Sequence, residues 1–282
     1  SVLDTCKRLE KQGRSTTVLA VSGDGSIDLD ILRGAVTERT AAVSVMAANN
    51  EIGVLAPLAE IAAIAHARGA LLHTDAVQAA GKVPLNVAAS GVDLASFTAH
   101  KLYGPKGVGA LYVRRKSPRV TLAPMLDGGG HERGMRSGTL NVPGIVGFGA
   151  AAALAGRCMA VESARLRQLR DRLLEGLKTR VGDLVVNGSL TTRLPGNLNV
   201  SFPGVDGEAL LVSLSDDVAL SSGAACTAAE PSHVLKALGR RTELALASLR
   251  FGLGRWTTLQ EVDAVAARVS DEVMRLRAMS PV

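Results

Sequence analysis

The sequence predicts an α/β protein: a large domain built on a mostly parallel sheet, followed by a smaller α+β domain. In the first 114 residues, short continuous apolar runs alternate with helical patterns. Such runs are typical of strands buried on both faces of a parallel sheet. After a long helical pattern over residues 142–181, the apolar runs become shorter and more widely spaced. Strands that alternate with helices indicate an α/β domain in the first part, and the more widely spaced strands after the long helix indicate an α+β domain in the second.

In the first part, an amphipathic helix over residues 1–14 precedes the predicted sheet. A second helix is predicted over residues 57–69, where Pro57 fits the first helical position and Gly69 fits the residue after the C-terminus. The predicted strands are residues 16–21, 41–47, 69–75, 93–99 and 108–114.

The second part follows the long helix. We expect strands at residues 183–188, 196–202, 217–223 and 247–254, and a closing helix at 257–279. The predicted domain boundary lies inside the long helix near Arg157, which divides the chain into residues 1–157 and 158–282.

Composition excludes several classes of protein. The formal net charge is +6, but acidic residues alternate with the basic ones and aromatic residues make up 2% of the chain, so nucleic-acid binding is not expected. No apolar run reaches the roughly 20 residues of a membrane helix. The N-terminus lacks the features of a secretory signal, so we expect a cytoplasmic protein that does not bind membranes. The three cysteines, Cys6, Cys158 and Cys226, form no CxxC pair and indicate neither a disulfide framework nor a metal site.

The stretch SFTAHKLYGPKG, residues 96–107, places Lys101 in a Gly-Pro turn just after a predicted strand. Alone, such a lysine would be interpreted as a surface side chain with a buried stem. However, α/β sheets bind ligands beyond the carboxyl ends of their strands. Asp75 ends another predicted strand, where it could otherwise cap a helix. A lysine and a carboxylate at one edge meet the needs of pyridoxal phosphate: a covalent link, and a partner that keeps the ring nitrogen protonated.

Four segments carry a family resemblance. HTDAVQAAGK, SFTAHKLYGPKGVGALYVRR, GGGHERGMRSGT and LSSGAAC resemble, in order and spacing, the group I cysteine desulfurases of iron-sulfur cluster assembly. These are fold-type I pyridoxal-phosphate enzymes. The resemblance implies a homodimer that converts L-cysteine to L-alanine and passes the sulfur, as a cysteine persulfide, to an iron-sulfur scaffold or another acceptor protein.

The resemblance also assigns cofactor contacts. Lys101 matches the lysine that forms a Schiff base and later moves the Cα proton. Asp75 matches the partner of the pyridine nitrogen, and Gln78, which we expect one helical turn further on, matches the ligand of the phenolic oxygen. Thr98 and His100 match ligands of the cofactor phosphate.

The remaining assignments concern substrate, partner subunit and sulfur transfer. Asn50 matches a residue that contacts both cofactor and substrate carboxylate, and Arg250 matches the arginine that binds that carboxylate. Thr139 matches a ligand of the neighbouring subunit's cofactor phosphate. Cys226 lies in a predicted loop of small residues and matches the nucleophile that accepts the sulfur.

The sequence departs from the family in three ways. Ala224 replaces the usual serine, and the segment from Cys226 to Pro231 is about two residues shorter than usual. The resemblance also begins just after an upstream region that holds the phosphate and supplies a histidine stacked on the ring. Either the chain is a fragment, or a second chain supplies that region, or strong cofactor binding has been lost. We expect this chain alone to bind the cofactor weakly.

Two alternative functions remain open at this stage. One is a selenocysteine lyase or other β-lyase, which would not need Cys226 for turnover of selenium. The other is a non-catalytic remnant that serves as a dimerising or scaffold-binding module.

Overall fold

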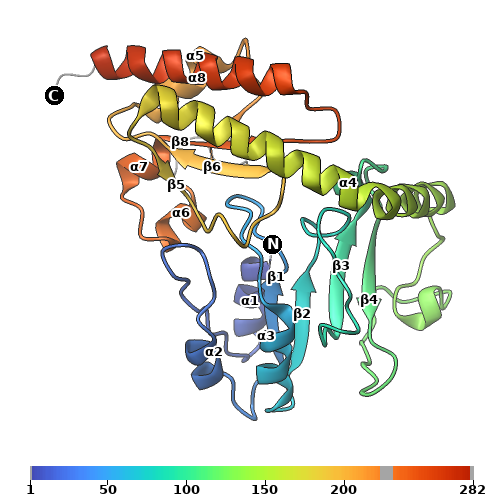
Figure 1. Cartoon of the computed structure of the whole chain (residues 1–282). Coiled ribbons are helices and arrows are strands. Elements are labelled where there is room, and N and C mark those ends of the chain that lie inside the picture. The colour runs from blue at the N-terminus through green and yellow to red at the C-terminus, as the bar shows by residue number, and fades with distance from the viewer. Residues whose placement is uncertain (1, 223–230, 280–282) are drawn as a thin grey trace.

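The computed structural model describes residues 2–222 and 231–279, which form two sheets joined by one long helix. Figure 1 shows this helix, α4, extending from the first sheet to the second, with α8 alongside its C-terminal half. The expected α/β architecture with a smaller C-terminal unit is therefore confirmed.

The first sheet has four strands in the order β1-β2-β3-β4. Strands β1, β2 and β3 are parallel, whereas β4 runs antiparallel to β3. The strands are β1 (Ala42–Met46), β2 (Leu71–Asp75), β3 (Leu94–Thr98) and β4 (Gly109–Val113). Four of the five strands predicted here are confirmed.

The fifth predicted strand, residues 16–21, is wrong. This segment joins neither described sheet, and none of its residues is fully buried. Leu19 and Val21 nevertheless pack against buried clusters. The apolar pattern thus reflects the partial burial of two side chains, but a strand also needs a neighbouring backbone to pair with.

The helices of the first part are α1 (Val2–Glu10), α2 (Leu29–Ala35) and α3 (Leu58–His66). Asp28 caps α2 by accepting hydrogen bonds from the backbone N–H groups of Asp30 and Ile31, at 2.8 and 3.0 Å. In α3, residues three and four apart, including Ile61 and Ala65, are buried against the sheet. Pro57 takes the N-cap position of α3, one residue before the predicted position.

The second part contains an antiparallel sheet in the order β5-β6-β8-β7. Its strands are β5 (Val185–Val186), β6 (Asn197–Ser201), β7 (Ser221–Ser222) and β8 (Ser248–Gly252). The helices are α4 (Val142–Val181), α5 (Gly207–Leu214), α6 (His233–Ala237), α7 (Thr242–Leu246) and α8 (Leu259–Met279). The four strands, the long helix and the closing helix all lie where the sequence predicts them.

The two halves of α4 pack differently. Ala155 lies against Gly81 of the first part, whereas the buried residues from Leu166 to Val181 belong to the cluster formed with β6, β8, α5 and α8. The predicted boundary near Arg157 falls between these two sets of contacts. The division into residues 1–157 and 158–282 stays a prediction.

Among the described residues, α4 is the one helix long and apolar enough to cross a membrane. The criterion is length and composition only: 18 of its residues reach a mean hydropathy of 1.6, and 11% of them are buried. One such helix is weak evidence, because helices of water-soluble proteins meet the same criterion. The expected absence of a membrane span stays a prediction.

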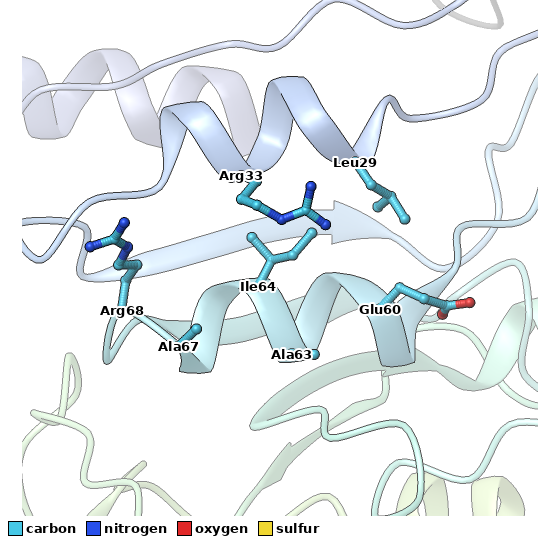
Figure 2. Close-up of a pocket in the computed structure, with 7 residues that line it drawn as sticks. All are labelled: Leu29, Arg33, Glu60, Ala63, Ile64, Ala67 and Arg68. Atoms are coloured by element: carbon cyan, nitrogen blue, oxygen red, sulfur yellow. The ribbon is translucent and has the colours of Figure 1, made fainter.

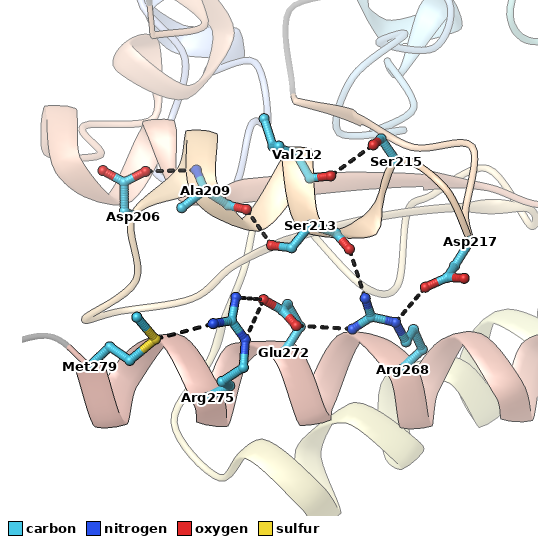
Figure 3. Close-up of polar contacts among 10 residues, drawn as sticks. All are labelled: Asp206, Ala209, Val212, Ser213, Ser215, Asp217, Arg268, Glu272, Arg275 and Met279. Atoms are coloured by element: carbon cyan, nitrogen blue, oxygen red, sulfur yellow. Dashed lines mark hydrogen bonds and ion pairs between the residues drawn. The ribbon is translucent and has the colours of Figure 1, made fainter.

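Arg268 links α8 to α5, and the buried carboxylate of Glu272 binds Arg268 (Figure 3). Glu272 on α8 accepts hydrogen bonds from Arg268 Nη1 at 3.0 Å and from Arg275 Nε at 3.0 Å. Arg268 also donates to the Ser213 carbonyl at 2.7 Å and to Asp217 Oδ2 at 2.6 Å. Asp217 lies between α5 and β7, so these bonds fix the segment that leads into β7.

We predict that replacing Glu272 with glutamine destabilises the fold in a pH-dependent manner. The hydrogen bond from Arg275, with smaller contributions from Ser213 and Arg268, lowers the pKa of Glu272 from 4.5 to about 2, although burial opposes this. The carboxylate therefore stabilises the fold above pH 4.5, and that contribution is lost as the pH falls towards 2. Glu272→Gln should lower the free energy of unfolding near pH 7 by about 1 to 3 kcal/mol.

Urea unfolding at several pH values measures this difference. The gap between Glu272→Gln and the original chain should narrow as the pH falls below 4.5. Glu175→Gln, at an exposed position of α4, is the matched control and should change stability little at any pH. If the difference in free energy of unfolding between the two proteins were the same at pH 7 and below pH 4.5, the stabilising role of the Glu272 carboxylate would be contradicted.

Candidate active site

Parallel strands bring the predicted site residues to one edge of the first sheet. Asp75 is the last residue of β2 and Thr98 is the last residue of β3, while Asn50 follows β1 after a short link. Asp75 pairs with Met46 of β1 and with Ser96 of β3. Because the three strands run in the same direction, their carboxyl ends form the ligand-binding edge typical of α/β sheets.

Lys101 lies in a short 3-10 helix, η1 (Ala99–Leu102), directly after β3. The turn is tight because Gly104 approaches the Ala99 carbonyl, and a Cβ at Gly104 would meet that oxygen at 3.0 Å and the Ala151 Cβ at 3.1 Å. Tyr103 ends η1 with a left-handed φ of 62°. Lys101 is exposed and forms no ion pair within the described part of the chain. The Gly-Pro stretch therefore holds a free ammonium at the edge of the sheet.

The two predicted phosphate ligands contact each other. Thr98 Oγ1 and His100 Nδ1 are 2.9 Å apart. Thr98 Oγ1 also lies 3.4 Å from the Val108 carbonyl of the loop that follows η1. His100 is exposed, so its second ring nitrogen remains available to a ligand.

Gln78 lies in a turn rather than on the helix that we expected. The Asp75 carboxylate accepts a hydrogen bond from the Val77 N–H at 3.0 Å, which starts the turn. The turn is closed by Gly81, which has a φ of 68° and packs against η1 and α4. Gln78 Oε1 accepts a hydrogen bond from Lys82 at 3.1 Å. The local pattern favoured a helix, but the left-handed glycine prevents one from forming.

His73 lies on β2, two residues before Asp75, and contacts side chains on both neighbouring strands. Its Nδ1 is 2.8 Å from Ser44 Oγ on β1, and its Nε2 is 3.0 Å from Ser96 Oγ on β3. Burial lowers the pKa of His73, and the negative charge of Asp75 opposes this shift only in part. A neutral imidazole with one donor and one acceptor nitrogen suits this position between two hydroxyl groups.

The second sheet contributes Arg250. This residue lies on β8, opposite Asn199 of β6 and Ser221 of β7. Its Nη1 donates to the Asn50 carbonyl at 3.1 Å. The structure therefore brings together the two residues that the resemblance assigns to the substrate carboxylate, although they are 200 positions apart.

Glu51 stabilises the region in which Arg250 contacts Asn50, and the sequence analysis did not identify this residue. Its carboxylate is buried and accepts a hydrogen bond from the Ser232 hydroxyl. The backbone carbonyl of Glu51 accepts hydrogen bonds from the side-chain amides of Asn197 at 3.2 Å and Asn199 at 3.4 Å. Burial raises the pKa of Glu51, while the Ser232 hydrogen bond and the charges of His233 and Arg250 oppose the rise. The position beside Asn50 was a possible signal, but the partners of Glu51 lie far away in the sequence.

Two predicted residues are not brought to this edge by any described contact. Thr139 is exposed between β4 and α4, and it forms no described hydrogen bond to the other site residues. Cys226 lies outside the described residues. The described chain stops at Ser222 of β7, next to β8, and resumes at Pro231, just before Ser232. Both flanks of the Cys226 segment therefore adjoin residues in contact with Arg250 or Glu51.

The donor set fits pyridoxal phosphate. Lys101 offers a primary amine that has no carboxylate partner in the described chain. Asp75 offers a carboxylate of which only one oxygen, Oδ1, accepts the hydrogen bond that starts the turn. The edge also offers an amide with free N–H groups (Gln78) and a hydroxyl–imidazole pair (Thr98 and His100). These are the groups needed for the covalent link, the ring nitrogen, the phenolic oxygen and the phosphate.

A separate hollow of about 610 Å³ lies between α2 and α3 (Figure 2). It is lined by Leu29, Arg33, Glu60, Ala63, Ile64, Ala67 and Arg68. None of the candidate site residues lines it, so the site is located by its chemistry and not by the size of a hollow.

Comparison with known proteins gives consistent matches. The aminotransferase class-V family matches residues 1–265. A protein named cysteine desulfurase IscS from Anaeromyxobacter sp. (strain Fw109-5) is 58% identical over 283 residues, which cover 100% of this chain and 70% of that protein.

Solved structures agree with this match. A NifS-like protein, 36% identical, superposes with a TM-score of 0.89 over 98% of this chain and 72% of its own. A structure described as SspA in complex with cysteine, 32% identical, gives a TM-score of 0.76 over 91% of this chain and 71% of its own.

Proposed function

This chain belongs to the cysteine desulfurases of the aminotransferase class-V family, which are pyridoxal phosphate enzymes, and from that premise we propose how its residues perform the reaction. The observation that carries the proposal is the contact of Arg250 with Asn50 at the sheet edge that also bears Asp75 and Lys101. This contact places the residues assigned to the substrate carboxylate at the same sheet edge as the residues assigned to the cofactor.

The cofactor contacts follow from the donor set. Lys101 would form the covalent link, and Asp75 would keep the ring nitrogen protonated. Gln78 would donate to the phenolic oxygen, and Thr98 and His100 would bind the phosphate. When bound, pyridoxal phosphate supplies an electron sink that makes the Cα–H bond of the amino acid acidic.

The substrate contacts involve the second sheet. Arg250 binds the carboxylate of L-cysteine with its planar guanidinium, and Asn50 supports that contact. With the cofactor in place, Lys101 would take the Cα proton as a general base. A neutral His73, fixed between two serines, keeps the strand that carries Asp75 in register without adding positive charge.

Cys226 accepts the sulfur. Its thiolate attacks the sulfur of L-cysteine, so that an S–S bond forms and the Cβ–S bond breaks. The bonding electrons of the Cβ–S bond stay with Cβ, which takes up one proton. Return of a proton to Cα then gives L-alanine, which leaves. Cys226 is left as a persulfide, and an iron-sulfur scaffold or another acceptor protein removes its outer sulfur.

The chain functions as a homodimer in the cytoplasm. Large apolar side chains at the start of α4 are exposed: Val142 by 59%, Ile145 by 43% and Val146 by 65%. A surface of this kind favours association. Thr139 lies just before this surface, where it can reach the cofactor phosphate of the second subunit.

We predict that the cofactor is attached to Lys101. Borohydride reduction of the protein with bound pyridoxal phosphate should give a stable adduct, and Lys101→Ala should abolish it. Lys106→Ala, an exposed lysine in the same turn, is the matched control and should retain the adduct. Peptide mass mapping identifies the modified residue. Retention of the adduct on another lysine in Lys101→Ala would refute the assignment.

We also predict that Cys226 carries the persulfide. After incubation with L-cysteine, mass mapping should find one added sulfur on the peptide that contains Cys226. Cys226→Ser should lower alanine production by about a hundredfold or more, the scale of losing a reacting group. Cys6→Ser and Cys158→Ser are the controls, because these residues lie half-buried on α1 and α4. Unchanged sulfide release by Cys226→Ser without a reductant would instead support a β-lyase.

A further inference from the structure

Lys82 is a half-buried lysine at the site to which the proposed reaction gives no role. Its ammonium donates to Gln78 Oε1 at 3.1 Å, and no described carboxylate forms an ion pair with it. Burial, and secondarily the positive charge of Lys101, lowers the pKa of Lys82 from 10.5 to about 8. A partly buried lysine near a second lysine, with no carboxylate partner in the described chain, is costly, which is typical of functional positions.

The backbone of Lys82 is fixed from two sides. The preceding residue, Gly81, has a left-handed φ of 68°, and a Cβ there would meet Leu102 Cδ2 at 2.6 Å and Ala155 Cβ at 2.8 Å. The Lys82 carbonyl accepts a hydrogen bond from Ser163 Oγ of α4 at 2.6 Å. Lys82 is therefore held between α4 and η1, the helix that carries Lys101.

The chemistry of the two side chains fixes the orientation of the amide. An ammonium group has three donors and no acceptor, so it can bind only the oxygen of Gln78. With the oxygen occupied, the N–H donors of Gln78 are left for other partners. A phenolic oxygen that carries negative charge needs such donors and would be repelled by the amide oxygen.

We propose that Lys82 is a positioning residue that holds the Gln78 amide with its N–H groups available to the phenolic oxygen of pyridoxal phosphate. The inference rests on the proposed function, which assigns Gln78 to that oxygen. Lys82 then acts through Gln78 and does not itself contact the cofactor. Losing Lys82 frees the amide to turn over, which weakens one hydrogen bond to the cofactor.

A double-mutant cycle with Gln78→Ala and Lys82→Met tests the proposal. The readouts are the dissociation constant of pyridoxal phosphate and the absorbance spectrum of the bound cofactor, neither of which depends on turnover. Lys82→Met should weaken binding about three- to tenfold, the scale of one hydrogen bond. In the Gln78→Ala background, Lys82→Met should change binding less than about twofold, because its effect passes through Gln78.

Two further variants separate positioning from folding. Lys82→Arg keeps a side chain that only donates, so it should restore affinity and spectrum to near those of the original chain. Gln78→Glu leaves Lys82 in place but offers the cofactor no N–H donor, and it should bind more weakly than Gln78→Ala. Lys178→Met, at an exposed position of α4, is the control for loss of a lysine and should have no effect. If Lys82→Met does not fold, Lys82→Arg and Gln78→Glu still give the decisive comparison.

Failure of the inference and failure of the proposed function give different results. Fully additive effects of Gln78→Ala and Lys82→Met, with the Lys101 adduct intact, would overturn the inference alone. Gln78→Glu binding as well as the original chain would overturn both the inference and the assignment of Gln78 to the phenolic oxygen, while leaving the Lys101 assignment in place. Absence of any Lys101 adduct in the original chain would overturn the proposed function and the inference with it.

Discussion

The candidate site depends on three strands that run in the same direction. Because β1, β2 and β3 are parallel, Asn50, Asp75 and Thr98 emerge at one edge of the sheet, and η1 places Lys101 beside them. Hydrogen bonds between His73 and the serines on both neighbouring strands keep this register. Reversing any one strand would move its terminal residue to the opposite edge, so the direction of the strands determines which side chains meet.

A buried joint then attaches the second sheet to this edge. The Glu51 carboxylate accepts a hydrogen bond from the Ser232 hydroxyl. The Glu51 backbone carbonyl accepts hydrogen bonds from the side-chain amides of Asn197 and Asn199. A buried carboxylate that lost its hydrogen-bond donor would be left with an uncompensated desolvation cost, so this joint has one favoured geometry. It holds Arg250 at Asn50 and fixes Ser232, which follows the Cys226 segment. The two residues that the proposed function assigns to the substrate carboxylate therefore share one structural support with Ser232.

Local signals in the sequence predicted most of the fold, and long-range contacts account for what they missed. Helices α3, α4 and α8 follow from periodicity and end signals within a few residues. Residues 16–21 were assigned wrongly, because an apolar run cannot report whether a partner strand exists. Glu51 was missed for a similar reason, since Ser232 lies 181 positions away. The candidate site residues could be proposed from the sequence because the motifs that carry the family resemblance are local, whereas contacts between side chains, such as the one between Lys82 and Gln78, emerge only on folding.

The central claim is that the second sheet completes the site by holding Arg250 for the substrate carboxylate. The most direct measurement is the KM for L-cysteine of Arg250→Ala and Arg250→Lys, with the absorbance of the bound cofactor recorded for each variant. Loss of a charge-assisted hydrogen-bonding group predicts a KM about ten- to a hundredfold higher for Arg250→Ala, a partial recovery for Arg250→Lys and an unchanged cofactor spectrum. An unchanged KM in Arg250→Ala, with the cofactor still bound, would contradict the account.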